Sequence, residues 1–453
     1  MHSREAVEGI TRREAAMAAA GAAVAAGVAP DTLKAAPDQV PFGLIGAGAR
    51  GQSLIQRLNG IGSGRCTAIC DVDEGSLRKA VQVSRARPQA FTDYRQLLAR
   101  QDVQAVLIAT PLHTHFPITR DALLAGKHVF CEPPLVFKPQ EIEPLRRLAA
   151  ERSSQILQAG FTRRYSQFYQ TARQMASKGM LGEVTEIQAQ WNWDSAWTMR
   201  PDVPRERNWR LFREFSGGIA AEMASHQIDI ANWVFADTPE FVTGVGSLDW
   251  RKDGRDIYDT VSLILKYPAG RKLTCSYSSM SRHLPCLGGA RSGPAEVIMG
   301  SEGSIEITLG TGDADGIGLW FYEPPASKLT KSAEQIEIAK IAGATVGTSA
   351  RSSRGFPILF ARDQISGNES FFERELKYAR RWLYSKGIMV PYEDRSPVDV
   401  QLDAFFESCR TGKPPKADVD AGLEASTAVI LSNLAMDEGR RVQFTEIARL
   451  ADR

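Results

Sequence analysis

The chain has no excess of charge of either sign, and this narrows the range of its partners. Its 453 residues contain 55 Lys and Arg against 53 Asp and Glu, which leaves a formal net charge of +2. Binding to nucleic acid or to an acidic surface normally uses a pronounced basic excess. We therefore expect no nucleic-acid partner.

Cysteine is scarce, and long apolar runs are absent from the body of the chain. The six cysteines include no C-x-x-C pair, so their spacing indicates neither a zinc site nor a disulfide framework. We predict no metal centre. No stretch after the first 36 residues is long and apolar enough to span a membrane, so we predict no membrane span.

Residues 1–36 have the composition of a targeting segment. Thr11-Arg12-Arg13 precedes an alanine-rich run from Ala15 to Ala29. Paired arginines before a modest apolar run are typical of the twin-arginine bacterial signal, whose pathway carries folded proteins. We predict a periplasmic or otherwise exported protein. The alternative is an N-terminal extension that is not a signal, in which case the protein stays in the cytoplasm.

A glycine-rich turn follows the first apolar run of the mature chain. The run Val40–Ile45 breaks at Gly46, and a helix-compatible run begins at Ser53. Strand, glycine turn and helix in this order form a dinucleotide fingerprint, in which the free N–H groups of the helix start face the pyrophosphate. The cofactor-binding residues predicted from this turn are Gly46, Gly48, Ala49, Arg50 and Gly51.

An acidic residue stands at the distance that this fingerprint requires. Asp71 ends a second apolar run, Ala68–Cys70. A carboxylate there accepts hydrogen bonds from the adenosine ribose and repels a 2′-phosphate. We therefore predict NAD as the cofactor in preference to NADP. The alternative is an ordinary βα turn that binds no ligand.

Residues 37–160 alternate between strand-like and helix-like runs. Three further apolar strands are predicted at Val103–Thr110, Lys127–Glu132 and Ile156–Phe161. This alternation predicts an α/β Rossmann domain with a doubly wound parallel sheet. Ligands of such sheets bind beyond the carboxyl ends of the strands. The candidate cofactor-binding residues at these ends are Thr110, Pro111, His113, His115, Glu132 and Pro133.

Residues 161–453 have a different pattern and are predicted to form an α+β domain with a largely antiparallel open sheet. Pro268-Ala269-Gly270 and Gly300-Ser301-Glu302-Gly303 each have the composition of a hairpin turn between two strand-like runs. Residues 310 to 390 carry few periodic signals, so we expect loops and short helices there. The expected flanking elements are a helix at Phe168–Lys178, a strand at Val184–Trp193 and closing helices at Val400–Arg410 and Gly422–Arg440.

One predicted helix carries three ionisable residues on one face. Ser216 is a plausible N-cap, and Glu222, His226 and Asp229 follow at spacings i, i+4 and i+7. On a regular helix these three lie within roughly 60° of one another. An imidazole beside a carboxylate suits removal of a hydroxyl proton while hydride leaves the same carbon. The alternative is a solvated helix face without catalytic function.

Aromatic and arginine side chains are concentrated before this helix. Indole rings stack on the apolar faces of sugars, so this cluster predicts a carbohydrate subsite. The alternative is that the indoles pack in the core or at an oligomer interface. The residues predicted to contact substrate here are Trp193, Trp209 and Arg210, together with Asp229 on the helix and Arg163 after the last Rossmann strand.

The chain resembles the glucose–fructose oxidoreductase, inositol dehydrogenase and rhizopine-catabolism (Gfo/Idh/MocA) family. The resemblance lies in GLIGAGARG, ATPLHTH, GKHVFCEPPL, QAGFTRRY and SGGIAAEMASHQIDIANW, which occur in the family's order. It implies a nicotinamide-binding first domain, a small-molecule sugar or cyclitol substrate and a homo-oligomer formed through the open sheet. It also implies that His226 sits at the substrate, although Glu222 stands where Asp or Asn is more usual.

The chain departs from the family at its E-K-P element. Glu132-Pro133-Pro134 places proline where the family has the lysine that relays the proton of the reacting oxygen. Proline has neither charge nor donor. The candidates to compensate are Arg163, Arg164 and Tyr165 after the last Rossmann strand, with Lys138 a weaker one at the next helix start. Three hypotheses remain: an NAD-dependent oxidoreductase on a sugar, glycoside or cyclitol hydroxyl, a redox-neutral NAD-dependent glycoside hydrolase or lyase, and a non-catalytic sugar- or nucleotide-binding member.

Overall fold

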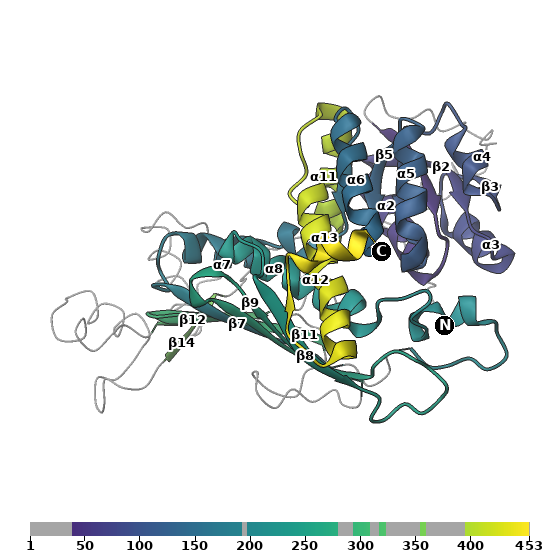
Figure 1. Ribbon diagram of the computed structural model, residues 1–453. Helices are drawn as coiled ribbons and strands as arrows, with labels where there is room; N and C mark the ends of the chain where they lie inside the picture. The colour runs from purple at the N-terminus through teal and green to yellow at the C-terminus, as the bar shows by residue number, and fades with distance from the viewer. Residues whose placement is uncertain are drawn as a thin grey trace, which may run out of the picture. The chain divides into compact units, whose positions relative to one another are not determined.

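The computed structural model describes residues 39–192, 197–279, 293–308, 317–322, 354–358 and 395–452 (Figure 1). The predicted signal segment and Trp193 lie outside the described residues, as does most of the segment 310–390. No helix among the described residues is long and apolar enough to cross a membrane.

The first domain is a six-stranded sheet with the order β3-β2-β1-β4-β5-β6, and all of its pairings are parallel. This confirms the predicted Rossmann architecture. Each central strand is an apolar run buried on both faces, as parallel sheets require. The strands are β1 (Val40–Ile45), β2 (Gly64–Cys70), β3 (Gln89–Phe91), β4 (Ala105–Ile108), β5 (His128–Cys131) and β6 (Leu157–Ala159).

The helices of this domain follow its strands, and one further helix returns from the end of the chain. The helices are α2 (Ala49–Ile61), α3 (Glu74–Val83), α4 (Tyr94–Leu98), α5 (His115–Leu124) and α6 (Pro139–Glu151), with a 3-10 turn, η1, at Leu112–Thr114. Helix α11 (Pro397–Thr411) packs on the sheet from the C-terminal part of the chain.

Two aromatic contacts fix α11 to the parallel sheet. The ring centroids of Phe42 and Phe406 lie 5.3 Å apart, and those of Phe130 and Phe405 lie 5.8 Å apart. Full burial of one such side chain contributes about 1.5–3 kcal/mol. A domain boundary placed only at residue 160 does not account for this helix.

The second domain contains a nine-stranded sheet with the order β14-β13-β12-β11-β7-β10-β9-β8-β15. Its pairings are antiparallel except between β7 and β10, which confirms the largely antiparallel sheet. The strands are β7 (Val184–Asn192), β8 (Phe241–Ser247), β9 (Thr260–Lys266), β10 (Lys272–Ser278), β11 (Gly293–Gly300), β12 (Gly303–Thr308), β13 (Ile317–Tyr322), β14 (Arg354–Ile358) and β15 (Val442–Gln443).

Strands β13 and β14 correct the expectation of loops and short helices between residues 310 and 390. Both strands extend the sheet beyond β12 by antiparallel pairing. Each has only five or six residues in a segment rich in Gly and Ser. So short a run carries little strand signal of its own, because β-propensity depends on the neighbouring strand.

Helices α8 and α12 pack together, and α12 also lies against β8 (Figure 1). Helix α12 begins at a true cap, since the Asp418 side chain accepts a hydrogen bond from Ala421 N at 3.0 Å. The remaining helical elements are η2 (Thr162–Tyr165), α7 (Gln167–Ser177), η3 (Arg205–Leu211), η4 (Ala220–Ala224), α8 (Ser225–Phe235), η5 (Pro268–Gly270), α12 (Val419–Glu438) and α13 (Glu446–Ala451).

Candidate active site at the carboxyl edge of the parallel sheet

The glycine turn between β1 and α2 has the geometry of a pyrophosphate seat. A Cβ on Gly46 would lie 2.6 Å from the backbone of Ala109, and one on Gly51 would lie 2.0 Å from Gly46 O. Gly46 also has a φ of +97°, which favours glycine. Gly48 faces open space and caps α2 without a side-chain hydrogen bond. The start of α2 therefore fits an anionic group.

Asp71 lies beside this turn at the end of β2. Its two carboxylate oxygens accept hydrogen bonds from Ala47 N at 2.6 Å and from Asp73 N at 2.8 Å. Ionised carboxylate oxygens have about four acceptor positions in total, so two remain for the hydroxyls of a ribose. These contacts connect the turn to the β2–α3 loop and fit the adenosine half of a dinucleotide.

On the other side of the turn, Arg50 connects to the end of β5. Its Nε donates to Glu132 Oε1 at 2.9 Å, in a partly exposed ion pair. A Cβ on Gly160 would lie 2.9 Å from Pro133 Cδ, so Pro133 packs against the end of β6. Beyond β4, Thr114 Oγ1 bonds Thr110 Oγ1 at 2.7 Å, next to Pro111. The predicted cofactor residues are thus gathered along one edge.

His115 is buried between two backbone carbonyls. Its Nδ1 is 2.8 Å from Pro134 O and its Nε2 is 2.9 Å from Thr110 O. A carbonyl oxygen only accepts, so both ring nitrogens must carry a proton and the imidazole is a cation. Burial lowers its pKa, but the Cys131 sulfur and the two carbonyls raise it to about 9. His115 is therefore a charged clamp between the ends of β4 and β5.

The His115 clamp predicts an alkaline loss of stability. The folded pKa of about 9 exceeds the ordinary value of 6.5, so the clamp contributes fully below about pH 6.5 and is lost as pH rises through about 9. The difference corresponds to about 3 kcal/mol in the free energy of unfolding. Urea unfolding at about pH 6.5 and about pH 9.5 should show this loss. His115→Gln, which does not titrate, should flatten it; equal pH dependence in both proteins would contradict the assignment.

The neighbouring His113 contacts Phe215 through its backbone and its ring. Its backbone N donates to Phe215 O at 3.3 Å, and its ring lies 5.0 Å from the Phe215 ring. Burial lowers the pKa of His113. This residue therefore connects the end of β4 to the second domain.

His226 lies in the first turn of α8, close to the aromatic rings of Phe161 and Trp191. Its ring centroid is 5.8 Å from that of Phe161 and 6.1 Å from that of Trp191. Burial, together with the charges of Arg163 and Arg50, lowers its pKa to about 3. The imidazole is therefore neutral at neutral pH.

Glu222 has a different partner from the one that regular helical spacing suggests. It lies in η4, a π-helical turn, and accepts a hydrogen bond from Arg210 Nε at 3.0 Å. The π turn replaces i→i+4 bonds by i→i+5 bonds, so the 100° spacing does not hold across it. The Arg210 guanidinium lies 4.1 Å from the centroid of the Trp209 ring. Trp209, Arg210 and Glu222 thus form one group.

Arg164 and Asp229, predicted for catalysis and substrate binding, are buried and paired with each other. Arg164 Nε donates to both carboxylate oxygens of Asp229, at 2.9 and 3.0 Å, and its Nη1 donates to Lys416 O. Only 1% of the Asp229 side chain is exposed. The short turn η2 directs Arg164 inward against α8. Tyr165 is buried as well, and burial raises the pKa of its phenol.

Sequence reasoning missed a buried carboxylate on β11. Glu296 Oε1 lies 3.3 Å from Arg163 Nη1 and accepts from Gln227 Nε2 at 2.7 Å, while Oε2 accepts from Tyr169 Oη at 2.5 Å. The Arg163 guanidinium lies 5.4 Å from the centroid of Trp191. The sequence feature that could have revealed this carboxylate is a single charged residue within an apolar strand, because a buried charge requires a partner.

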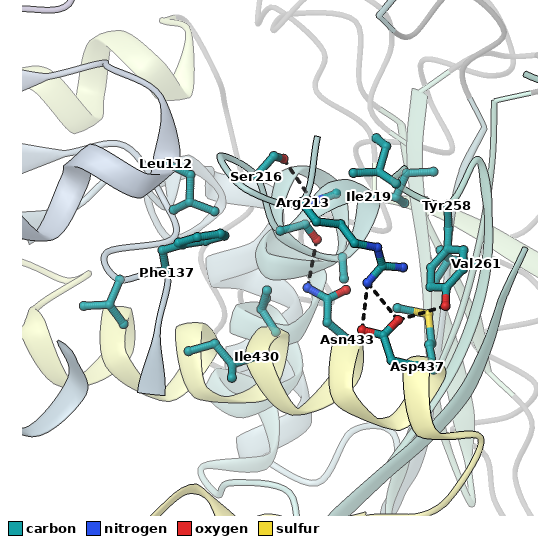
Figure 2. Close-up of a pocket in the computed structure, with 17 residues that line it drawn as sticks. Leu112, Phe137, Arg213, Ser216, Ile219, Tyr258, Val261, Ile430, Asn433 and Asp437 are labelled. Atoms are coloured by element: carbon teal, nitrogen blue, oxygen red, sulfur yellow. Dashed lines mark hydrogen bonds and ion pairs between the residues drawn. The ribbon is translucent and has the colours of Figure 1, made fainter. Parts of the chain in front are cut away.

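A cavity of about 280 Å³ lies near this site but contains none of the predicted site residues (Figure 2). Its polar rim is internally paired: Arg213 bonds Asp437 at 2.7 Å, and Asn433 Nδ2 donates to Gly217 O at 2.9 Å. The apolar wall includes Leu112, Phe137, Ile219, Val261 and Ile430. The cavity is therefore not part of the candidate active site.

Comparison with known proteins gives the family. The model of the oxidoreductase family with an NAD-binding Rossmann fold matches residues 40–161, and the GFO/IDH/MocA C-terminal domain matches residues 169–306. Inositol 2-dehydrogenase of Gluconacetobacter diazotrophicus is 29% identical over 43% of this chain and 53% of its own length. A glycosyl hydrolase family 109 protein of Shewanella amazonensis is 32% identical over 45% of this chain and 50% of its own.

Similarity to solved structures extends over most of the described fold. The aldose-aldose oxidoreductase of Caulobacter crescentus, crystallised with glycerol, gives a TM-score of 0.65 at 19% identity, covering 89% of this chain and 99% of that one. The chain spans about half the length of the curated relatives it matches. Because the two family models together cover more than half of the sequence, the chain belongs to the Gfo/Idh/MocA oxidoreductase family and carries its NAD-binding Rossmann domain.

Proposed function

We propose that the protein is an NAD-dependent oxidoreductase that oxidises a hydroxyl of a sugar, glycoside or cyclitol to a carbonyl. The observation that carries the proposal is the position of the His226 imidazole, whose ring centroid lies 5.8 Å from that of Phe161, after β6, and 6.1 Å from that of Trp191 on the second sheet. A neutral imidazole at this place takes the hydroxyl proton. When bound, NAD supplies the hydride acceptor at the carboxyl edge of the parallel sheet.

Residues of this chain hold the two halves of the reaction in place. The open glycine turn and Asp71 fit the pyrophosphate and the adenosine ribose, and a carboxylate there disfavours the 2′-phosphate of NADP. The Trp209 indole, with Arg210 and Glu222 beside it, supplies an apolar ring and polar groups for a sugar. The proximity of the apolar ring to these polar groups supports a carbohydrate substrate, since a sugar has apolar C–H faces as well as polar hydroxyl groups.

A redox-neutral glycoside hydrolase is the second candidate. Two observations favour it: Pro133 offers no proton donor where the family has lysine, and relatives named as glycosyl hydrolase family 109 proteins are 32% identical. In such a cycle a hydroxyl is oxidised, the adjacent C–H loses its proton, the aglycone leaves, water adds, and the hydride returns. His226 would again serve as the proton acceptor.

One experiment separates these candidates. Purified protein is incubated with NAD or NADP and with a panel of free sugars, cyclitols and p-nitrophenyl glycosides, while NADH and nitrophenol are followed together. NADH accumulation from a free sugar or cyclitol supports the oxidoreductase. Nitrophenol release without NADH selects the hydrolase. Binding of sugar or NAD with neither product would reject both and indicate a non-catalytic member.

We infer that the protein is exported, from the twin-arginine pattern at Thr11-Arg12-Arg13. Replacement of both Arg12 and Arg13 by Lys is expected to retain the protein in the cytoplasm, because that pathway reads the arginine pair. Immunoblots of periplasmic and cytoplasmic fractions measure the outcome. Unchanged fractionation would contradict the inference.

We propose a homo-oligomer formed through the open face of the second sheet. Val245 on β8 and Ile264 on β9 leave 69% and 45% of their surfaces exposed. Exposed apolar side chains on neighbouring strands are a common feature of interfaces. Analytical ultracentrifugation of the wild type should give the molar mass of a dimer or of a larger oligomer. The double variant Val245→Lys, Ile264→Lys should shift that molar mass towards the value of the monomer. A wild-type monomer at all concentrations would refute this.

A further inference from the structure

A segment of the second domain contacts the Rossmann domain on both sides of the glycine turn. We call residues 197–215, which include η3, the strap. Arg207 Nη2 lies 2.5 Å from Asp73 Oδ1, and Phe215 O accepts a hydrogen bond from His113 N at 3.3 Å. The rings of His113 and Phe215 add a contact at 5.0 Å. The strap is therefore fixed to the first domain at two separate points.

The order of the parallel strands places these two points on opposite sides of the dinucleotide groove. Asp73 follows β2 and His113 follows β4, while β1 lies between those strands in the sheet. The turn Gly46–Gly51 comes from the end of β1. The two contacts of the strap therefore lie on either side of the turn that fits the pyrophosphate.

Hydrogen bonds and apolar packing fix the conformation of the strap. The buried Asn208 side chain bonds Arg200 N and O, at 3.2 and 2.8 Å, and its Nδ2 also donates to Val203 O. Trp197, with a φ of +49°, is held by Arg255 Nη2, which donates to Trp197 O at 2.9 Å. The C-terminal part of the strap packs into an apolar cluster of Leu211, Phe212, Phe215 and Ile257.

An exposed apolar side chain lies beside the Arg207 contact. Val72, between Asp71 and Asp73, leaves 88% of its surface uncovered. Isolated exposure of an aliphatic side chain is common, but here it adjoins the carboxylate that fits a ribose. Val72 precedes Asp73, which holds Arg207 of the strap, so this exposed side chain adjoins both the ribose carboxylate and the strap contact.

We propose that the strap is a second wall of the NAD site and that the Arg207–Asp73 ion pair slows release of the cofactor. The proposal rests on the proposed function, since it assumes that NAD occupies the groove. With the strap anchored at Asp73 and His113, the dinucleotide leaves only after the Asp73 anchor opens. The cofactor is then held longer than an open Rossmann edge would hold it.

The dissociation rate of NADH tests the strap directly and needs no substrate. The full-length protein is loaded with NADH and mixed in a stopped flow with excess NAD, and the loss of energy transfer from tryptophan to NADH is followed. Arg207→Ala should speed dissociation by about 2- to 5-fold, the scale of one partly exposed ion pair. Arg207→Glu, which faces Asp73 with like charge, should speed it by about tenfold.

Arg205 is the matched control within the strap. It is exposed to the same extent but pairs with Asp256 of the second domain, at 3.6 Å, rather than with the Rossmann domain. Arg205→Ala and Arg205→Glu make the same changes of charge two residues away. They should leave the NADH dissociation rate within about 2-fold of the wild type, because Asp256 does not anchor the strap across the groove. Thermal melting of each variant confirms folding.

Failure of the strap and failure of the proposed function have different outcomes. If Arg207 and Arg205 variants release NADH at the same rate as the wild type, the strap does not retain the cofactor, and the oxidoreductase proposal is unaffected. If folded wild-type protein binds no NADH, the proposed function fails and the strap proposal fails with it. Faster release in the Arg205 variants alone would also overturn the strap proposal.

Discussion

Replacement of His226 by alanine is expected to lower turnover by about 10²- to 10⁴-fold, the usual contribution of a general base. The imidazole is neutral because burial and the charges of Arg163 and Arg50 lower its pKa to about 3. The substitution removes the proton acceptor and leaves the glycine turn intact. NAD affinity should therefore stay within about 3-fold of the wild type, as that turn binds the phosphates.

Steady-state kinetics and calorimetric titration of NAD measure the two halves of this prediction. His226→Gln keeps a polar side chain of similar reach without a basic ring nitrogen, so it should be as slow as the alanine variant. The wild-type kcat/KM should not fall through protonation of His226 between about pH 8 and about pH 5, since the folded pKa lies below that range. Full activity of His226→Ala would reject the site.

Local sequence signals predicted the first domain because each of its elements is specified by a few adjacent residues. The turn Gly46–Gly51 needs glycine at Gly46 and Gly51, where a Cβ would meet backbone atoms. The strands around it are short apolar runs between turns. Strand ends at one edge of a parallel sheet are neighbours by topology, so gathering Asp71, Thr110 and Glu132 required no knowledge of tertiary contacts.

The parts that were not predicted depend on contacts between distant segments. Regular 100° spacing predicted that the Glu222 carboxylate lies beside His226. The π turn η4 changes that spacing, and the carboxylate accepts a hydrogen bond from Arg210 instead. Helix α11 is amphipathic by pattern, yet nothing local says that its phenylalanines pack on the first domain's sheet. The strap is likewise visible only when the Arg207–Asp73 contact, 134 residues apart, is known.

The burial of Arg164 and Asp229 shows the same limit of local reasoning. Both were expected at the site, because Asp229 shares a helix with His226 and Arg164 follows the last Rossmann strand. A sequence pattern gives the face of a helix but not what covers it. Here the carboxylate faces η2 and the charged pair is almost fully enclosed, with 1% of the Asp229 side chain and 10% of the Arg164 side chain exposed.

Asp229→Ala is therefore expected to act on stability rather than on substrate binding. Removal of one partner leaves the Arg164 guanidinium buried without its counter-charge, which typically costs about 3–5 kcal/mol in the free energy of unfolding. Urea denaturation at neutral pH measures the loss. Glu74→Ala is the matched control, because Glu74 pairs with Arg78 on an exposed helix surface at 3.1 Å, where a pair contributes about 0–1 kcal/mol.

A double variant separates a structural ion pair from a substrate contact. Arg164→Met with Asp229→Leu removes both buried charges, so it should recover part of the stability that Asp229→Ala loses. If Asp229 instead bound substrate, Asp229→Ala would keep the wild-type unfolding midpoint and would raise KM. Arg164 Nε donates to both Asp229 oxygens at 2.9 and 3.0 Å, and only 1% of the Asp229 side chain is exposed, so the loss of stability is the expected result.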